Sequence, residues 1–157
     1  MRFVQFKRKN EPGCQYLGVS SDDGSKIKDL GLIGCYPNDL KKLIESGVNI
    51  GEIKAKVENV ESISTGDVEL LPPISEPQKI LCVGLNYRGH CDEQKKEYPK
   101  EPMFFSKYAS TLVGPTGNVI AHKISNEIDW EVELAVIIGA KACLLYTSPS
   151  PRDRQKS

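Results

Sequence analysis

Residues 70–77 contain three prolines, and this segment constrains the fold more than any other part of the sequence. Proline has no backbone N–H and a fixed φ, so these residues can form neither a continuous helix nor a central strand. We therefore expect a domain boundary here. Residues 1–71 are expected to form a small N-terminal α/β unit, and residues 72–142 to begin a second, β-rich domain. The expected fold class is α+β.

The N-terminal unit shows the signals of a hairpin and of two helices. An Asp-Gly pair separates two short strand-like runs, residues 16–19 and 26–28, which is typical of a hairpin turn. A first helix is expected after Asp39, ending at Gly47, and a second after Asn49, because capping side chains precede apolar residues with helical spacing. No pattern in this unit indicates chemistry, so we interpret it as scaffold.

The second domain is expected to begin with a buried strand at residues 80–84. A helix follows, capped by Asn86 and ended before Pro99. Further strands are expected at residues 103–106, 119–121 and 129–139. The last of these runs is the most strand-like in the sequence.

Composition excludes several classes of function. The 21 basic and 21 acidic residues balance, which removes the usual electrostatic argument for binding nucleic acid or an anionic membrane surface. No apolar run is long enough to cross a bilayer, and the N-terminus lacks the apolar stretch of a signal peptide. The five cysteines form no CxxC pair, so neither a zinc knuckle nor a thioredoxin-type centre is expected. Scattered thiols suit a reducing compartment, and we expect a soluble intracellular protein.

Glu131 and Glu133 alternate with apolar residues in the run 129–139. On a strand both carboxylates point to one face, which they share with Ile137, so we expect the strand to be buried on both sides. At a separation of about 6 Å and an effective dielectric of about 20, their repulsion is roughly 3 kcal/mol, and a divalent cation bound by both would remove it. The alternative is the solvated face of an edge strand. The pair is a candidate metal site.

His90 and Glu93 lie three residues apart in the helix expected after Asn86, so they share one helical face. A carboxylate beside an imidazole orients the ring and raises its basicity, as in dyads that deprotonate water or a carbon acid. The alternative is an ordinary surface pair. The other histidine, His122, has no evident partner and is expected to be structural.

Several blocks of this sequence resemble, in order, those of the fumarylacetoacetate hydrolase family. The resemblance covers residues 1 to about 142. It rests on His90 and on residues 72–74, 79–87, 102–107 and 129–139. The second domain is therefore expected to be the start of a β-rich catalytic domain of this type.

The resemblance implies roles for several side chains. Glu131 and Glu133 would be two of three carboxylate ligands of Mg²⁺, with Mn²⁺ or Ca²⁺ as alternatives. His90 and Glu93 would be a dyad on a lid segment that closes over bound substrate. Lys107 would lie near the pocket, with no catalytic role assigned to it.

The resemblance also implies an activity. Members act on 2-oxo and 1,3-dicarbonyl acids, with a metal ion that stabilises an enolate. Oxaloacetate keto–enol tautomerisation is the reaction we expect of the full-length protein, and C–C bond hydrolysis and decarboxylation are the alternatives. A homodimer and a mitochondrial location are expected by resemblance, with the cytoplasm as the alternative location.

Residues 143–157 are expected to be a foreign, disordered tail. Residues 143–153 match the translation of a common transposase sequencing adapter, and the alternative is a natural tail rich in serine and proline. The family's third metal ligand, an aspartate on a later strand, does not occur before this tail, and we do not assign that role to Asp153. We therefore expect an incomplete catalytic domain. An inactive fragment that only binds a partner is the alternative for the chain as written.

Overall fold

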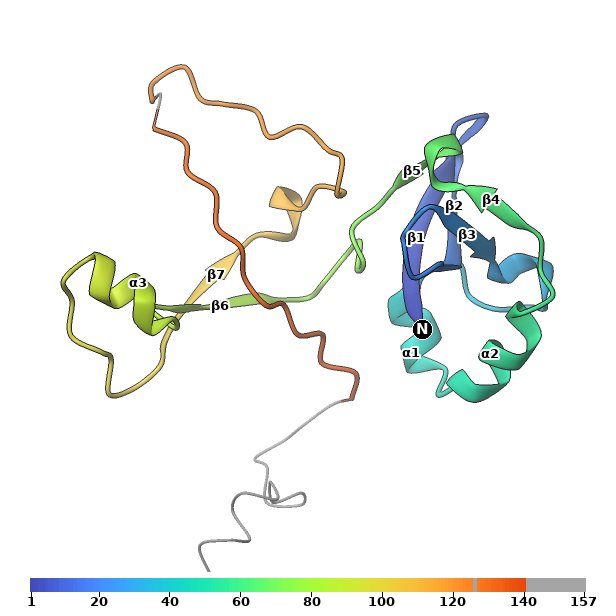
Figure 1. Ribbon diagram of the computed structural model, residues 1–157, viewed down its shortest axis with the longest axis horizontal. Coiled ribbons are helices and arrows are strands. Elements are labelled where there is room, and N and C mark those ends of the chain that lie inside the picture. The colour runs from blue at the N-terminus through green and yellow to red at the C-terminus, as the bar shows by residue number, and fades with distance from the viewer. Residues whose placement is uncertain (126, 141–157) are drawn as a thin grey trace, which may run out of the picture.

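The computed structural model of the protein, shown in Figure 1, describes residues 1–125 and 127–140. Helices and antiparallel sheets occur together, so the fold is α+β, as the sequence predicts. A unit with a five-stranded sheet lies at the N-terminus. Residues 71–79 connect it to a smaller part with a two-stranded sheet. The tail expected at residues 143–157 lies outside the described residues.

The five-stranded sheet has the order β4-β3-β2-β1-β5, and its neighbouring strands are antiparallel. Its elements are β1 (Arg2–Arg8), β2 (Glu11–Ser20), β3 (Lys26–Asp29), β4 (Ser62–Ser64) and β5 (Val68–Leu70), with the 3-10 turns η1 (Leu30–Leu32) and η2 (Thr65–Asp67). The hairpin predicted between β2 and β3 is confirmed. Gly24 lies in its turn with φ of 74°, a conformation that glycine adopts without a steric penalty.

Both helices predicted in this unit are confirmed. The helix α1 (Leu40–Glu45) is capped by the Asp39 side chain, and the chain leaves it through Gly47 with φ of 66°. The helix α2 (Ile50–Val57) is capped by the Asn49 side chain. Each cap satisfies a backbone N–H that has no partner within the helix, and such a contact stabilises a helix by about 1 kcal/mol. In the part of the chain that the structure describes, no helix is both long enough and apolar enough to span a membrane.

The apolar core of this unit lies on both faces of the sheet. On one face it joins the sheet to α1 and α2, which lie side by side at one end of the strands (Figure 1). Its buried members are Leu17, Val19, Leu30, Leu40, Leu43, Ile53 and Val57. A smaller cluster of Phe6, Ile27 and Val68 lies on the opposite face. There Phe6 stacks on Tyr16 with ring centres 5.5 Å apart.

Gln5 is a fully buried polar residue on the helical face of β1. Its Nε2 donates to the Pro72 carbonyl at 2.8 Å and to Ser75 Oγ at 2.9 Å. Its Oε1 accepts from the backbone N–H of Leu40 at 2.8 Å and from Gln15 Nε2 at 3.1 Å. A buried amide is tolerated only when its hydrogen bonds are made. This one side chain therefore joins β1 and β2 to the start of α1 and to the proline-rich linker.

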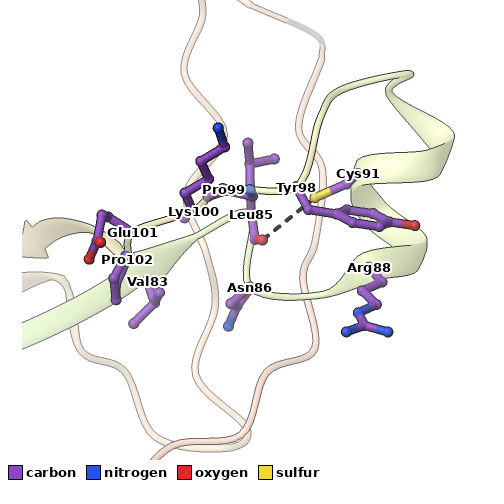
Figure 2. A pocket seen from close by; sticks show the side chains of 11 residues that line it. Val83, Leu85, Asn86, Arg88, Cys91, Tyr98, Pro99, Lys100, Glu101 and Pro102 are labelled. Atoms are coloured by element: carbon purple, nitrogen blue, oxygen red, sulfur yellow. Dashed lines mark hydrogen bonds between the residues drawn. The ribbon is translucent and has the colours of Figure 1, made fainter.

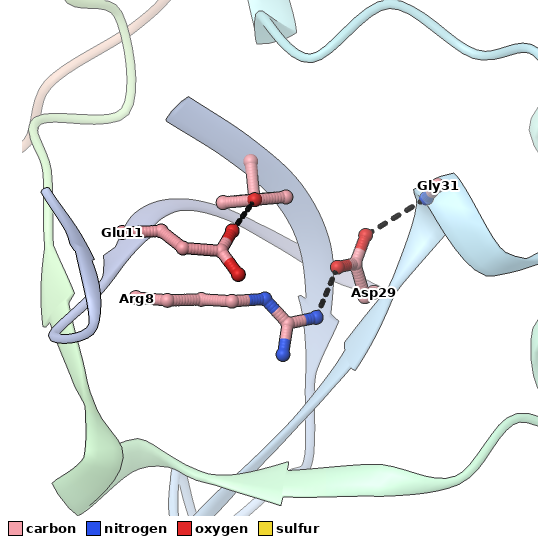
Figure 3. A network of polar contacts seen from close by, with 5 residues as sticks. Arg8, Glu11, Asp29 and Gly31 are labelled. Carbon is pink, nitrogen blue, oxygen red and sulfur yellow. Dashed lines mark hydrogen bonds and ion pairs between the residues drawn. The ribbon is translucent and has the colours of Figure 1, made fainter. Parts of the chain in front are cut away.

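Arg8 is the centre of a second polar network, shown in Figure 3. Its Nη2 donates to the buried Asp29 carboxylate at 2.7 Å, and the other oxygen of Asp29 accepts from Gly31 N at the start of η1. The guanidinium lies 5.0 Å from the centre of the Tyr16 ring. The hydroxyl of Tyr16 donates to Glu11, and this bond raises the pKa of Tyr16 to about 12. The network holds β1 against β2 and β3.

The second part of the chain contains β6 (Ile80–Gly84), α3 (Arg88–Glu93), β7 (Met103–Lys107) and the 3-10 turn η3 (Ala109–Thr111). The strands predicted at residues 80–84 and 103–106 are confirmed, and β6 pairs antiparallel with β7. The expected burial of the first is wrong, because Leu81 is 64% exposed. The helix is also shorter than predicted, and its N-cap is Tyr87 rather than Asn86.

The strands predicted at residues 119–121 and 129–139 are not formed by the described residues. A strand requires a hydrogen-bonded neighbouring strand. The hydrogen bond described between this region and the N-cap of α3 runs from Leu134 N to Tyr87 Oη at 3.3 Å, and it does not pair two backbones. The expected burial on both faces is therefore also wrong. Trp130 is 81% exposed and Val136 74% exposed.

Replacing Gln5 by leucine is predicted to destabilise the protein by about 2–4 kcal/mol, because several buried groups lose their partners together. Urea denaturation followed by far-ultraviolet circular dichroism measures the change. The control is Gln78→Leu, the same substitution at an exposed linker glutamine, with an expected change within about 0.5 kcal/mol. Equal stability of the two variants would show that the Gln5 network is dispensable.

Replacing Gly18 by alanine is predicted to cost about 1–3 kcal/mol through overpacking. A Cβ at this position would lie 2.7 Å from Ile27 Cγ2 and 2.8 Å from the Lys28 carbonyl oxygen. Gly13 lies in the same strand, and a Cβ there would meet no atom within 4 Å, so Gly13→Ala is the matched control. The same urea midpoint for both variants would contradict the close approach of β3 to Gly18.

Candidate active site

The helix α3 brings together two of the residues that the sequence singles out. His90 Nδ1 lies 3.8 Å from Glu93 Oε2, and their side chains are 45% and 80% exposed. This separation is too long for a hydrogen bond but lies within reach of an ion pair once the ring is protonated. The spacing of three residues on one helix creates the pair directly.

Gln94 is a further neighbour of this pair that the sequence analysis did not identify. Its Nε2 lies 2.8 Å from His90 Nε2. With the amide in this orientation the nitrogen donates and the ring accepts at Nε2, an arrangement that corresponds to the tautomer with its proton on Nδ1. The signal in the sequence is the spacing of four residues between His90 and Gln94, which places both on one helical face.

Glu131 and Glu133 lie in the irregular segment described above, and both are exposed. Their oxygens have the right chemistry for Mg²⁺, but two carboxylates are an incomplete set for an ion that prefers octahedral coordination. Within residues 1–125 and 127–140, no group of three or more His, Cys, Asp or Glu side chains could hold a metal ion. The described residues alone therefore do not form a complete metal-binding site.

Lys107, the third candidate position, ends β7 and is exposed. Its Nζ lies 5.6 Å from the centre of the Phe105 ring. The described contacts join Lys107 neither to His90 nor to the two glutamates. The structure thus brings His90 and Glu93 together and leaves the other candidates separate.

A pocket of about 360 Å³ lies on the other side of α3, between the helix and the loop that leads to β7 (Figure 2). Its lining includes Arg88, Cys91 and Tyr98, but neither His90 nor Glu93. Cys91 is only 1% exposed, and its thiol donates to the Leu85 carbonyl at 3.6 Å. The pocket therefore lies between α3 and the following loop, and neither residue of the dyad lines it.

Tyr98 contacts both ends of α3 from that loop. Its hydroxyl donates to Asp92 Oδ1 at 2.7 Å, and the Arg88 guanidinium lies 5.7 Å from the centre of its ring. The hydrogen bond to Asp92 raises the pKa of the Tyr98 phenol above its ordinary value, because ionisation would remove the proton that the phenol donates.

The sequence matches a known family model. Residues 79–148 match the model described as fumarylacetoacetate (FAA) hydrolase C-terminal. The matched segment contains all the candidate residues, namely His90, Glu93, Lys107, Glu131 and Glu133. It also runs past residue 142, into the segment expected to be a foreign tail, and the boundary of that tail stays a prediction.

Curated relatives match most of this chain. The chain is 39% identical over 144 residues to a Bos taurus protein named oxaloacetate tautomerase FAHD2A, mitochondrial. The aligned residues cover 90% of this chain and 46% of that protein. It is 38% identical over 144 residues to the Homo sapiens protein of the same name, with the same coverage. A Dictyostelium discoideum homologue of fumarylacetoacetate hydrolase domain-containing protein 2 is 39% identical over 112 residues, which cover 68% of this chain and 36% of that protein. The chain thus spans about half the length of the first two relatives.

The fold also resembles a solved structure. A crystal structure of a Mycobacterium smegmatis protein assigned as HpcE superposes with a TM-score of 0.53 and 18% sequence identity. The match covers 76% of this chain and 41% of that one. At this identity the similarity supports the α+β fold alone.

Replacing Asp92 by alanine is predicted to lower the pKa of Tyr98 toward the ordinary phenol value of about 10. The ultraviolet absorbance of the phenolate is followed against pH, and the titration of Tyr98→Phe is subtracted to isolate this one side chain. Glu97→Ala removes a neighbouring charge without removing the hydrogen bond, so it is predicted to change the pKa less. A larger effect of Glu97→Ala would contradict the bond between Tyr98 and Asp92.

Proposed function

The chain belongs to the fumarylacetoacetate hydrolase family, and from this membership we propose that it is part of a metal-dependent oxaloacetate keto–enol tautomerase. The observation that carries the proposal is the similarity to proteins named oxaloacetate tautomerase over 90% of the chain. Because the chain spans about half of those proteins, the activity is proposed for the complete gene product. A mitochondrial location is proposed from the same names. A homodimer stays a prediction.

A tautomerase moves a proton between a carbon and an oxygen atom of its substrate. We propose that His90 accepts and returns this proton, because imidazole does both near neutral pH. Glu93, 3.8 Å from His90 Nδ1, would stabilise the ring while it carries the extra proton. Gln94 Nε2 lies 2.8 Å from His90 Nε2, so a substrate that exchanges its proton at that nitrogen would displace the amide.

The proposed metal ion would be held by Glu131 and Glu133 together with ligands from outside the described residues. When bound, Mg²⁺ would supply positive charge to the oxygens of a 2-oxo acid and so favour its enolate. The two glutamates would supply hard oxygen ligands, and the charge of the bound ion would offset their mutual repulsion. Lys107 is retained as a candidate for contact with the substrate.

Replacing Glu131 by glutamine is predicted to reduce kcat/KM for oxaloacetate tautomerisation by at least about 100-fold and to weaken Mg²⁺ binding, because a metal ligand loses its charge. The complete gene product is assayed for keto–enol exchange, and Mg²⁺ affinity is measured by calorimetry. Glu127→Gln makes the same change in the same exposed segment and is predicted to alter kcat/KM less than about threefold.

The assay also separates the alternative reactions. Pyruvate formed at the catalytic rate would assign the protein to decarboxylation. Cleavage of a 1,3-dicarbonyl acid without keto–enol exchange would assign it to C–C hydrolysis. Full activity of Glu131→Gln, with unchanged Mg²⁺ affinity, would remove this glutamate from the proposed site.

A further inference from the structure

The helix that carries His90 and Glu93 cannot hold its own position. It has six residues and no side-chain hydrogen bond at its N-cap, Tyr87. Isolated helices of this length are not stable in water, because the free-energy cost of forming the first turn exceeds the stabilisation gained from the few hydrogen bonds that follow. Only Cys91 among its residues is buried. The place of α3, and with it the place of the dyad, must therefore be set by contacts from elsewhere.

Tyr98 provides two of these contacts from the loop that follows. Its hydroxyl donates to Asp92 at 2.7 Å, and its ring lies under the guanidinium of Arg88, 5.7 Å away. Arg88 and Asp92 are four residues apart, so they lie on one side of the helix near its two ends. Figure 2 shows the Tyr98 ring alongside Arg88 and Cys91. One aromatic side chain thus spans the length of α3.

The backbone adopts a left-handed conformation on either side of α3. Leu85 has φ of 51° and Lys95 has φ of 53°, and these are the non-glycine residues with positive φ in the described chain. A left-handed conformation costs a side-chain-bearing residue roughly 1–2 kcal/mol. At Lys95 this cost is offset, because the turn closes the end of α3: the Lys95 N–H donates to the Asp92 carbonyl at 3.1 Å and the Lys96 N–H to the Cys91 carbonyl at 2.9 Å. The backbone thus caps only the C-terminal end of α3, and the contacts of Cys91 and Tyr98 hold the rest of the helix.

The dyad has no comparable contacts of its own. The described side-chain contacts of His90 are to Glu93 and Gln94, within the same helix and its C-cap. The pair therefore moves with α3 as one body. Whatever fixes the helix also fixes where His90 presents its ring nitrogens.

We propose that Tyr98 is a positioning residue that clamps α3 at Arg88 and Asp92 and so holds His90 and Glu93 in place. The clamp itself follows from the contacts above. Its consequence for proton transfer rests on the proposed function. Since Tyr98 is 53% exposed and lies outside the core of the N-terminal unit, its replacement leaves that unit folded.

The first test is hydrogen exchange in the full chain. Tyr98→Leu removes both contacts, and the Cys91 and Gln94 amides, which bond within and at the end of α3, are predicted to exchange about tenfold faster. Tyr98→Phe keeps the ring and is predicted to give a smaller increase, of about threefold. The matched control, Tyr108→Leu, replaces an exposed tyrosine in the next segment and leaves these rates unchanged. The amides of β1 and β2 report that the N-terminal unit is folded.

The second test reads the dyad directly, through the ¹⁵N chemical shifts of the two His90 ring nitrogens at a pH where the ring is neutral. In the unmodified chain, these two shifts are predicted to be those of the Nδ1–H tautomer. In Tyr98→Leu, they are predicted to move toward the shifts of the His122 ring nitrogens. Unchanged exchange rates and unchanged His90 shifts in Tyr98→Leu would overturn the clamp.

Activity of the complete gene product separates this inference from the proposed function. Tyr98→Leu is predicted to lower kcat at least fivefold, with Mg²⁺ affinity and KM retained, and Tyr98→Phe to restore most of it. Tautomerase activity that does not respond to Tyr98→Leu would refute the positioning role alone. Faster exchange of α3 in a protein without tautomerase activity would uphold the clamp and refute the proposed function.

Discussion

The buried amide of Gln5 is the contact on which the arrangement of this chain depends. It bonds β1 to β2 through Gln15, to the first turn of α1 through Leu40, and to the linker through Pro72 and Ser75. Leaving one such buried group without a partner costs about 1–3 kcal/mol, so the bonds support one another. They fix where the proline-rich linker leaves the N-terminal unit, and therefore where the second part of the chain begins.

The two parts of the molecule are stabilised in different ways. The N-terminal unit has an apolar core on both faces of its sheet and two polar networks. The part that carries the candidate chemistry has a two-stranded sheet and a short helix whose only buried residue is Cys91. Elements with so few buried contacts have a low free energy of local unfolding. The scaffold is thus the rigid half, and the candidate site depends on a few individual contacts such as those of Tyr98.

Local signals were predicted well, because they depend on residues that are neighbours in sequence. The Asp-Gly hairpin and the caps at Asp39 and Asn49 are examples. The proximity of His90 and Glu93 follows from helical geometry in the same way. Nothing in the local sequence marked Gln5 as buried, since its partners lie as far away as the linker. The strand expected at residues 129–139 needed a neighbouring strand, which the described residues do not supply.

Residue order alone indicated the family, the α+β class, the hairpin between β2 and β3, the caps of α1 and α2, and the spacing that pairs His90 with Glu93. These depend on covalent order and on backbone geometry over a few residues. The tertiary fold was needed to show that the pocket lies on the side of α3 opposite His90 and Glu93, and that Tyr98 contacts the helix near both of its ends. Those contacts depend on how the loop after α3 folds back and on rotamers, and the spacing of residues in the chain encodes neither.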